Sequence, residues 1–181
     1  MNNQMYYRRL SREEIKKFIQ IDRTEIIESI YYQREDGLVL EKKYYSVPDW
    51  RVSEKLSRIK DLQQDFDDGA TFFGALDGDN FVGMSVLDHN TVRSGDRGLN
   101  LEGLWVSHQY RRKGIGKKLF QLAVKEARKR NAKVLYVSAT PSENTVNFYK
   151  SLGCRRAEPV DEYLFKKEPE DIHLELNLEK D

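Results

Sequence analysis

A short run near the middle of the chain combines two glycines with a dense cluster of cations. It begins at Tyr110 and reads YRRKGIGKKL, which places five basic side chains around the glycines: Arg111, Arg112, Lys113, Lys117 and Lys118. A strand-like stretch precedes the run and a helix-like stretch follows it. Glycine lets a ligand approach the backbone closely, because no Cβ stands in the way. The first turn of a helix presents unpaired amides and a partial positive charge, so the run predicts a phosphate site.

The spacing of the glycines excludes two common phosphate-binding loops. The dinucleotide fingerprint G-x-G-x-x-G requires a third glycine where Leu119 stands. The nucleoside-triphosphate loop G-x-x-x-x-G-K-[ST] requires glycine at Arg111 and a hydroxyl residue at Lys118. The spacing that remains is Arg111-x-x-Gly114-x-Gly116, which resembles the R/Q-x-x-G-x-G/A signature of the GCN5-related N-acetyltransferases, the GNAT family.

A second segment adds to this resemblance. Residues 144–154 read NTVNFYKSLGC and are similar to the family's N-x-x-x-x-F-Y-x-x-x-G-F element, with Cys154 in place of the usual aromatic residue. The four matching positions are Asn144, Phe148, Tyr149 and Gly153. The two motifs stand in the family's order, and the resemblance extends over residues 5–178. It implies an enzyme that uses acetyl-CoA as cosubstrate to acetylate an amine.

The resemblance also implies which residues hold the coenzyme. The loop amides would bind its pyrophosphate, and amides of the preceding strand would face the acetyl-pantetheine arm. The side-chain amide of Asn144 would contact the same arm. The expected coenzyme-binding residues are Leu104, Trp105, Val106, Arg111, Arg112, Lys113, Gly114, Ile115, Gly116, Lys117 and Asn144.

Two side chains are candidates for proton transfer. Glu102 lies on the strand that leads into the loop and is the candidate general base. Its alternatives are to orient the amine or simply to pair with a cation, because the strand register decides which way it points. Tyr149 is protonated at neutral pH and is the candidate general acid for the leaving thiolate. Burial of its ring in the core is the alternative.

Composition limits the class of protein. The chain has 181 residues and a formal net charge of +1, which fits one domain over residues 1–181 and gives no argument for nucleic-acid or membrane binding. Cys154 is the single cysteine, which excludes an internal disulfide. The N-terminus lacks the apolar core of a signal peptide. We therefore expect a cytoplasmic monomer or homodimer. The three histidines have no close ligand spacing, so no metal site is expected.

Periodicity predicts mixed α and β structure with a βαβ unit. The resemblance refines this to the GNAT acyl-CoA acyltransferase fold, an α/β (α+β) fold with a mixed, mostly antiparallel sheet of about seven strands and about four helices. A capping box at Ser11 and Glu14 should open the first helix, with apolar positions continuing to Ile26. The expected strands are 5–10, 70–76, 81–87, 99–106, 133–139, 164–165 and 172–178; the other helices are 52–66, 115–130 and 142–152; and 31–50 and 89–98 are irregular.

The acceptor amine is the least determined feature. A small amine is the default, and a cationic one would suit the aromatic and acidic residues of the expected acceptor region: Tyr31, Tyr32, Tyr44, Tyr45, Trp50 and residues 158–171. Ribosomal-protein alanine acetyltransferases resemble the chain in both motifs but carry a catalytic Glu where Tyr136 stands. The alternatives are a protein or peptide amine acetyltransferase, a non-catalytic acyl-CoA sensor of the same fold, and a nucleic-acid-binding domain built on residues 111–133. The last of these lacks interleaved aromatic residues.

Overall fold

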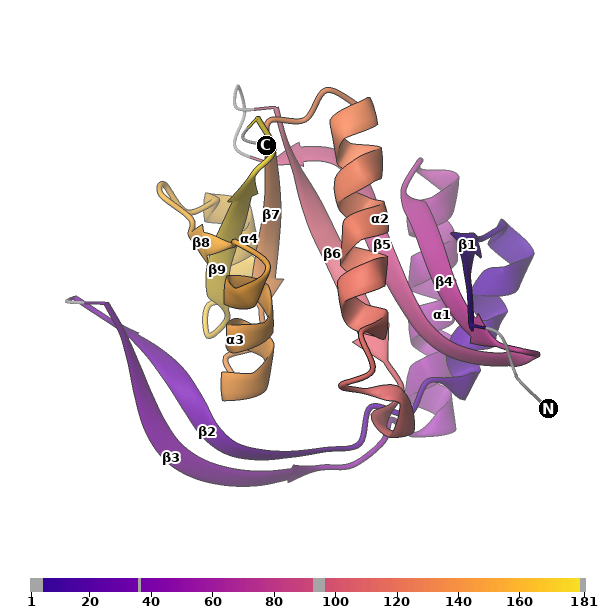
Figure 1. The fold of residues 1–181 in the computed structure, drawn as a ribbon, viewed down its shortest axis with the longest axis horizontal. Coiled ribbons are helices and arrows are strands. Elements are labelled where there is room, and N and C mark those ends of the chain that lie inside the picture. The colour runs from indigo at the N-terminus through magenta and orange to yellow at the C-terminus, as the bar shows by residue number, and fades with distance from the viewer. Residues whose placement is uncertain (1–4, 36, 93–96, 180–181) are drawn as a thin grey trace.

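A seven-stranded sheet forms the centre of the computed structural model, which describes residues 5–35, 37–92 and 97–179 (Figure 1). The strand order is β1-β4-β5-β6-β7-β9-β8, and of these neighbouring pairs only β6 and β7 run parallel. The predicted fold class is confirmed. The strands are β1 (Met5–Arg9), β4 (Thr71–Asp77), β5 (Asn80–Val92), β6 (Gly98–Val106), β7 (Val134–Ala139), β8 (Arg155–Arg156) and β9 (Ile172–Asn177).

Helices cover both faces of this sheet, and strand alternation decides which side chains each of them meets (Figure 1). On β4, Phe72 and Leu76 pack with the helices of one face, whereas Phe73 and Ala75 pack beneath α2 on the other. The helices are η1 (Arg12–Gln20), α1 (Val52–Asp67), η2 (His108–Tyr110), α2 (Ile115–Lys129), α3 (Glu143–Ser151) and α4 (Glu162–Lys167). No helix in the described ranges is long and apolar enough to cross a membrane.

The first helix is shorter than the apolar spacing predicted. The capping box is present, because the Ser11 N–H donates to Glu14 Oε2 at 3.1 Å. However, η1 is a 3₁₀ helix that ends at Gln20, and Ile26 lies exposed on a strand. The spacing of apolar residues alone therefore predicted a helix that is too long.

A long hairpin replaces the irregular segment expected at residues 31–50. It consists of β2 (Glu25–Arg34) and β3 (Gly37–Val47), which form a separate two-stranded sheet. Most of β3 is exposed, and β2 is partly exposed with only Ile27 buried, so the apolar alternation that marks a half-buried strand is missing. In Figure 1 it curves below the sheet and reaches α3, where the Tyr31 N–H donates to the Pro141 carbonyl oxygen at 2.8 Å.

Two further expectations are wrong at the sheet margins. β5 continues to Val92, so the first part of the expected 89–98 loop is a strand, while residues 93–96 lie outside the described ranges. Residues 164–165 belong to helix α4 rather than to a strand, because Asp161 caps that helix: its Oδ1 accepts the Leu164 N–H at 2.9 Å. The strand that pairs with β9 at this edge is β8.

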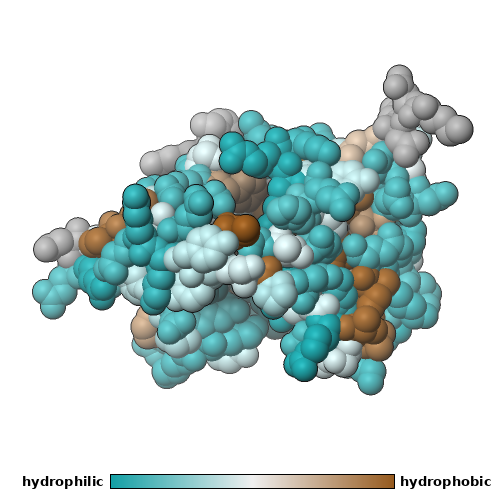
Figure 2. All heavy atoms as spheres, turned by 90° about the horizontal axis from the view of Figure 1, so that it is seen from below, coloured by the Kyte–Doolittle hydropathy of each residue, from teal (hydrophilic) through white to brown (hydrophobic). Residues whose placement is uncertain are grey.

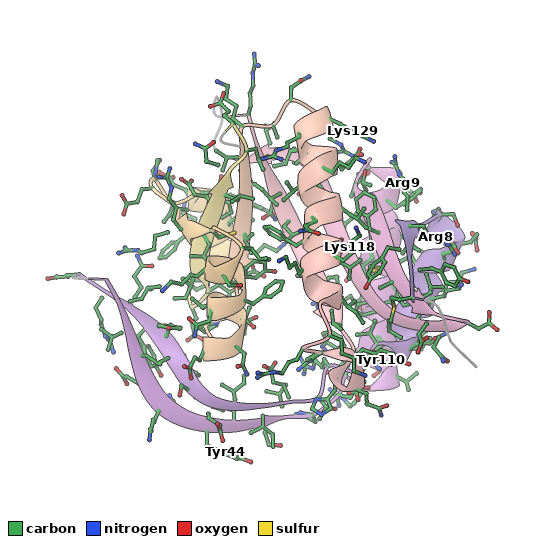
Figure 3. The ribbon with its side chains drawn as sticks, in the orientation of Figure 1. Arg8, Arg9, Tyr44, Tyr110, Lys118 and Lys129 are labelled. Carbon is green, nitrogen blue, oxygen red and sulfur yellow. The ribbon has the colours of Figure 1, made fainter. Side chains whose placement is uncertain are left out.

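The surface is mostly hydrophilic, with separate hydrophobic patches when the molecule is viewed from below (Figure 2). Exposed apolar side chains lie on the hairpin, such as Val39 and Leu40, on α1, such as Val52, and on α4, such as Phe165. Tyr44 of the hairpin points away from the body of the molecule (Figure 3). Scattered exposed apolar groups of this kind are ordinary for a folded domain.

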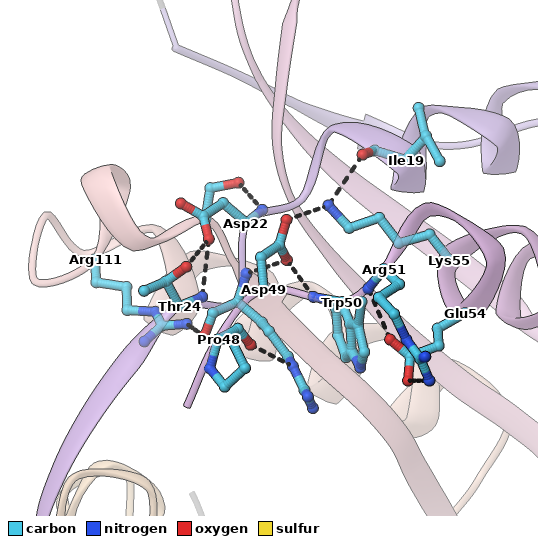
Figure 4. A network of polar contacts seen from close by, with 12 residues as sticks. Ile19, Asp22, Thr24, Pro48, Asp49, Trp50, Arg51, Glu54, Lys55 and Arg111 are labelled. Carbon is cyan, nitrogen blue, oxygen red and sulfur yellow. Dashed lines mark hydrogen bonds and ion pairs between the residues drawn. The ribbon is translucent and has the colours of Figure 1, made fainter. Parts of the chain in front are cut away.

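A buried ion pair fixes the root of the hairpin to α1 and η1 (Figure 4). The side chain of Lys55 is only 8% exposed, and its Nζ donates to Asp49 Oδ2 at 2.6 Å and to the Ile19 carbonyl oxygen at 3.3 Å. Asp49 Oδ1 accepts the backbone N–H groups of Arg23 and Trp50. Burial opposes ionisation of Asp49, but these hydrogen bonds outweigh it and hold its pKa below the ordinary value.

We predict that Asp49→Ala lowers the free energy of unfolding at pH 7 by about 2 kcal/mol, because it leaves the buried Lys55 ammonium without its carboxylate; solvent at the 35%-exposed Asp49 side chain keeps the loss below that of a fully buried pair. The contribution of a carboxylate with a depressed pKa is present above its unfolded-state value and is lost as the pH falls through its folded-state value. Urea unfolding should therefore show a smaller difference from wild type at pH 3. Arg51→Ala is the control, because its 82%-exposed side chain pairs with Glu54 at the surface. Equal losses from the two variants at pH 7 would contradict this role for Asp49.

Candidate functional site

The site begins where two central strands separate. β6 and β7 pair only through Gly98–Asn100 and Val134–Tyr136, and beyond these residues they diverge (Figure 1). The second half of β6 remains paired with β5 on its other side. That half therefore has one edge without a neighbouring strand.

The direction of each amide on this half of β6 follows from strand alternation. The Ser107 N–H donates to the Val82 carbonyl oxygen at 2.9 Å, so it points toward β5. Successive amides of a strand point to opposite edges, so the Trp105 N–H also points to β5, whereas those of Leu104 and Val106 point to the open edge. Of the three amides expected to face the acetyl-pantetheine arm, two have this orientation. The Trp105 N–H points away from the open edge, and the Trp105 ring packs edge-on against Phe18.

A β-bulge determines where Glu102 points. Val86 pairs with Gly103 and Leu87 pairs with Leu101, so Glu102 has no partner on β5. The bulge requires glycine next to it, because a Cβ on Gly103 would lie 1.9 Å from the Trp105 ring.

The Glu102 carboxylate is held by hydrogen bonds on both of its oxygens. Oε2 accepts the Asn100 Nδ2–H at 2.9 Å, and Oε1 accepts Lys167 Nζ of α4 at 3.1 Å. The carboxylate thus lies on the face of the sheet opposite α2, and its nearest cation is supplied by the protein itself.

The predicted phosphate loop has the conformation of an anion site. Arg112 and Gly114 have φ values of 60° and 80°, and the Lys118 N–H makes the first helical bond, to the Gly114 carbonyl oxygen at 3.0 Å. The amides before Lys118 have no partner within the helix. Ile115 contributes only its amide, because its side chain is buried. Gly116 lies beneath Phe148, whose ring carbon would be 3.3 Å from an added Cβ.

The Arg111 side chain bonds to backbone carbonyl groups of the protein. Its Nε donates to the Val106 carbonyl oxygen at 3.0 Å, and an Nη donates to the Arg23 carbonyl oxygen at 2.9 Å. An ion pair with Glu25 adds to these contacts. The guanidinium therefore ties the loop to β6 and to the hairpin, which leaves only the Arg111 backbone for a ligand.

The other cations of the loop surround its mouth. Arg112, Lys113, Lys117 and Lys118 are exposed, and the Lys113 ammonium lies over the Tyr110 ring at 5.1 Å from its centre. Figure 3 shows Tyr110 at the foot of α2 and Lys118 along its surface. These charges give the side of the sheet covered by α2 a positive field near the open strand edge.

The second motif forms α3, with Ser142 as its N-cap and Gly153 after its end. Tyr149 is 6% exposed and packs against Phe120 of α2, with ring centres 5.9 Å apart. Burial raises the pKa of its hydroxyl above the ordinary value, so the group stays protonated at neutral pH. Asn144 lies exposed in the first turn of α3.

Cys154 is a core residue. It is buried in the same cluster as Tyr149, and burial raises the pKa of its thiol to about 12. A thiol in this state is not a nucleophile at neutral pH.

A cavity of about 460 Å³ lies on the opposite face, next to Glu102. Its charged lining residues come from four parts of the fold: Asp65, Asp68, Asp88, His89, Glu102, Asp161 and Lys167. Asp161 and Lys167 belong to the acidic 158–171 segment expected near the acceptor, but the expected tyrosines and Trp50 lie elsewhere. Sequence reasoning missed Asp65, Asp88 and Asn100, since no short motif links residues that the fold brings together.

The comparisons with known proteins agree on one family. The model of the acetyltransferase (GNAT) family matches residues 35–154. An N-acetyltransferase encoded in the pepI 3' region of Lactobacillus delbrueckii subsp. lactis is 28% identical over 88 residues. That match covers 47% of this chain and 51% of the relative, so the chain spans about half the length of this curated protein.

Solved structures show the same fold. Nourseothricin acetyltransferase has a TM-score of 0.68 at 18% identity, covering 96% of this chain and 98% of its own. A putative streptothricin acetyltransferase from Bacillus anthracis, solved with acetyl coenzyme A, has a TM-score of 0.66 at 18% identity, covering 98% and 99%. The PaiA N-acetyltransferase of Thermoplasma acidophilum, solved with coenzyme A, has a TM-score of 0.63 at 17% identity, covering 96% and 99%.

The loop geometry predicts that Gly114→Val lowers the affinity for coenzyme A by more than about tenfold, since a branched side chain would stand over the free amides. Gly78→Val is the matched control, because Gly78 also has positive φ (58°) but lies in the turn between β4 and β5. Both variants should lose similar stability, because a β-branched residue is strained at positive φ. Titration calorimetry with coenzyme A separates them; equal affinities for the two variants would mean that the loop does not hold the coenzyme.

Proposed function

This chain belongs to the acetyltransferase (GNAT) family and is an acyltransferase, and on that premise we propose that it moves an acetyl group from acetyl-CoA directly to a primary amine of a small molecule. The observation that carries the proposal is the open edge of β6. Its Leu104 and Val106 amides end next to the loop at 111–117, and Glu102 lies on the same strand. We further propose one catalytic domain over residues 1–181 in the cytoplasm.

In the proposed reaction, the backbone supplies the binding and the polarisation. The amides of residues 111–117 hold the pyrophosphate, with Arg112, Lys113 and Lys117 adding positive charge and Asn144 contacting the pantetheine arm. The Leu104 and Val106 amides donate to the thioester carbonyl oxygen, where negative charge develops. One such preorganised donor typically contributes about 3 kcal/mol to the stability of the transition state.

Two proton movements accompany the transfer. The acceptor ammonium loses a proton to Glu102, and its nitrogen then attacks the carbonyl carbon. The new C–N bond forms, the C–S bond breaks, the second amine proton passes to the leaving sulfur, and Glu102 releases its proton to solvent. The products are the acetylated amine, free coenzyme A thiol and one released proton.

The role proposed for Tyr149 is narrower than full proton donation. Burial raises its pKa further above that of a thiol, whose ordinary value is about 8.5. Transfer of the phenolic proton to the thiolate is therefore uphill. We propose that Tyr149 donates a hydrogen bond to the leaving sulfur.

A small-molecule acceptor is favoured by two observations. Two of the fold neighbours are named as acetyltransferases of nourseothricin and streptothricin, which are small molecules. The cavity beside Glu102 has the volume of a small-molecule site. A screen of amines with acetyl-CoA, read by release of free thiol, tests the proposal. Tight binding of acetyl-CoA without thiol release for any amine would favour a non-catalytic binding module instead.

We predict that Glu102→Gln lowers kcat by about a hundredfold and flattens the acidic limb of the pH–rate profile, because the amide cannot accept a proton. The control is Glu13→Gln, the same substitution at an exposed position of η1, which should leave kcat and the pH–rate profile unchanged. If Glu102 only orients the amine, its variant raises KM and keeps the acidic limb. A Glu102→Gln variant with the kcat, KM and pH profile of the wild type would exclude both roles.

Tyr149→Phe is expected to lower kcat by about tenfold, which is about the contribution of one neutral hydrogen bond to the leaving sulfur. Its affinity for coenzyme A should be nearly unchanged. The comparison variant is Tyr6→Phe, which removes an exposed hydroxyl from β1. Single-turnover kinetics isolates the chemical step, and a rate equal to wild type would assign Tyr149 to packing alone.

A further inference from the structure

The cavity beside Glu102 has an unusual excess of negative charge. Asp65 and Asp68 approach it from the end of α1, Asp88 from β5, Glu102 from β6 and Asp161 from the start of α4. Lys167 and His89 are the basic side chains in the described lining. The cavity lies on the face opposite the cationic loop, so the two charged regions would bind ligands of opposite sign.

The carboxylates of this cavity influence one another. Asp65 is partly buried, and its side chain forms no hydrogen bond or ion pair with the described residues. Burial raises its pKa and the charges of Glu102 and Asp88 raise it further, while the Lys167 ammonium only partly offsets them. A cation bound among the three would relieve this repulsion.

An unpartnered buried oxygen gives an independent sign of a ligand. Asn100 lines the cavity and is only 3% exposed. Its Nδ2–H donates to Glu102, but its Oδ1 has no hydrogen-bond partner among the described residues. A buried carbonyl oxygen without a donor is destabilising, because it has lost its hydrogen bonds to water. A carbonyl oxygen can only accept hydrogen bonds, so the missing partner is a group with an N–H or O–H donor.

The protein already places one ammonium group in the cavity. Lys167 Nζ lies 3.1 Å from Glu102 Oε1 and so occupies a position that an amine could take. The other carboxylates are spread around the lining, and no three His, Cys, Asp or Glu side chains in the described ranges converge as a metal site requires. A distributed set of this kind suits a ligand with several separated charges better than a single metal ion.

We propose that the acceptor carries at least two ammonium groups, as in a diamine or polyamine. One is the nucleophile beside Glu102; the other is bound by Asp65, Asp88 and the Asn100 Oδ1 atom. The inference rests on the proposed amine acetylation and specifies its substrate class.

The experiment compares 1,4-diaminobutane with n-butylamine, which has the same chain length and one amine fewer. We expect kcat/KM to be about a hundredfold higher for the diamine than for the monoamine. The second ammonium would contact two carboxylates, and each contact would raise kcat/KM by about tenfold. Asp65→Asn should lower the diamine value about tenfold and change the monoamine value less than twofold. The control is Asp61→Asn, which removes the same charge at an exposed position of α1 and should change kcat/KM for neither amine. Lys167→Met should lower the KM of the diamine by removing a competing cation.

Calorimetric binding of the same amines, in the presence of coenzyme A, keeps the inference separate from the proposed function. Diamine binding that is weakened by Asp65→Asn, without thiol release for any amine, would overturn the function and support the cavity assignment. Thiol release with equal kcat/KM for both amines, or a diamine preference insensitive to Asp65→Asn, would overturn the inference alone. Absence of both diamine binding and diamine turnover would overturn it as well.

Discussion

The early end of pairing between β6 and β7 is the constraint on which the site depends. A parallel pair is normally extended by further ladder bonds, yet here only three residues of each strand are paired. Separation leaves backbone amides on β6 without a strand partner, which is costly unless a ligand or water satisfies them. Other contacts hold the two strands. Arg111 donates to the Val106 carbonyl oxygen at the end of β6, and β7 is paired with β9 over its whole length.

The sheet also separates two electrostatic environments that the net charge of +1 conceals. The loop and α2 present cations near the open edge, whereas the cavity on the opposite face is lined mainly by carboxylates. An anionic coenzyme and a cationic acceptor would thus approach from different sides and meet at β6. The bulge at Glu102 matters for the same reason, because it brings a carboxylate of that strand into the acidic cavity.

Local sequence signals predicted the parts of the site that depend on local structure. The glycine loop at the start of α2 follows from two glycines and a helix-like stretch, and the fold class follows from the resemblance carried by residues 111–116 and 144–153. The sequence did not reveal contacts between residues that are distant in the chain. The Arg111 side chain, for example, bonds to the Arg23 carbonyl oxygen, 88 positions away. Asp65, Asp88 and Asn100 meet only in the folded chain. The hairpin β2–β3 was missed because most of β3 is exposed and only Ile27 of β2 is buried, so neither strand shows a clear apolar alternation.

The central claim is that the open edge of β6 receives the thioester arm, and residue-resolved amide hydrogen exchange tests it most directly. In the free protein, the Trp105 and Ser107 amides should exchange slowly because they bond to β5, while those of Leu104 and Val106 exchange faster. Saturating acetyl-CoA should then slow Leu104 and Val106 and leave Trp105 nearly unchanged. Exchange at Leu104 and Val106 that is unaffected by bound acetyl-CoA would contradict the account.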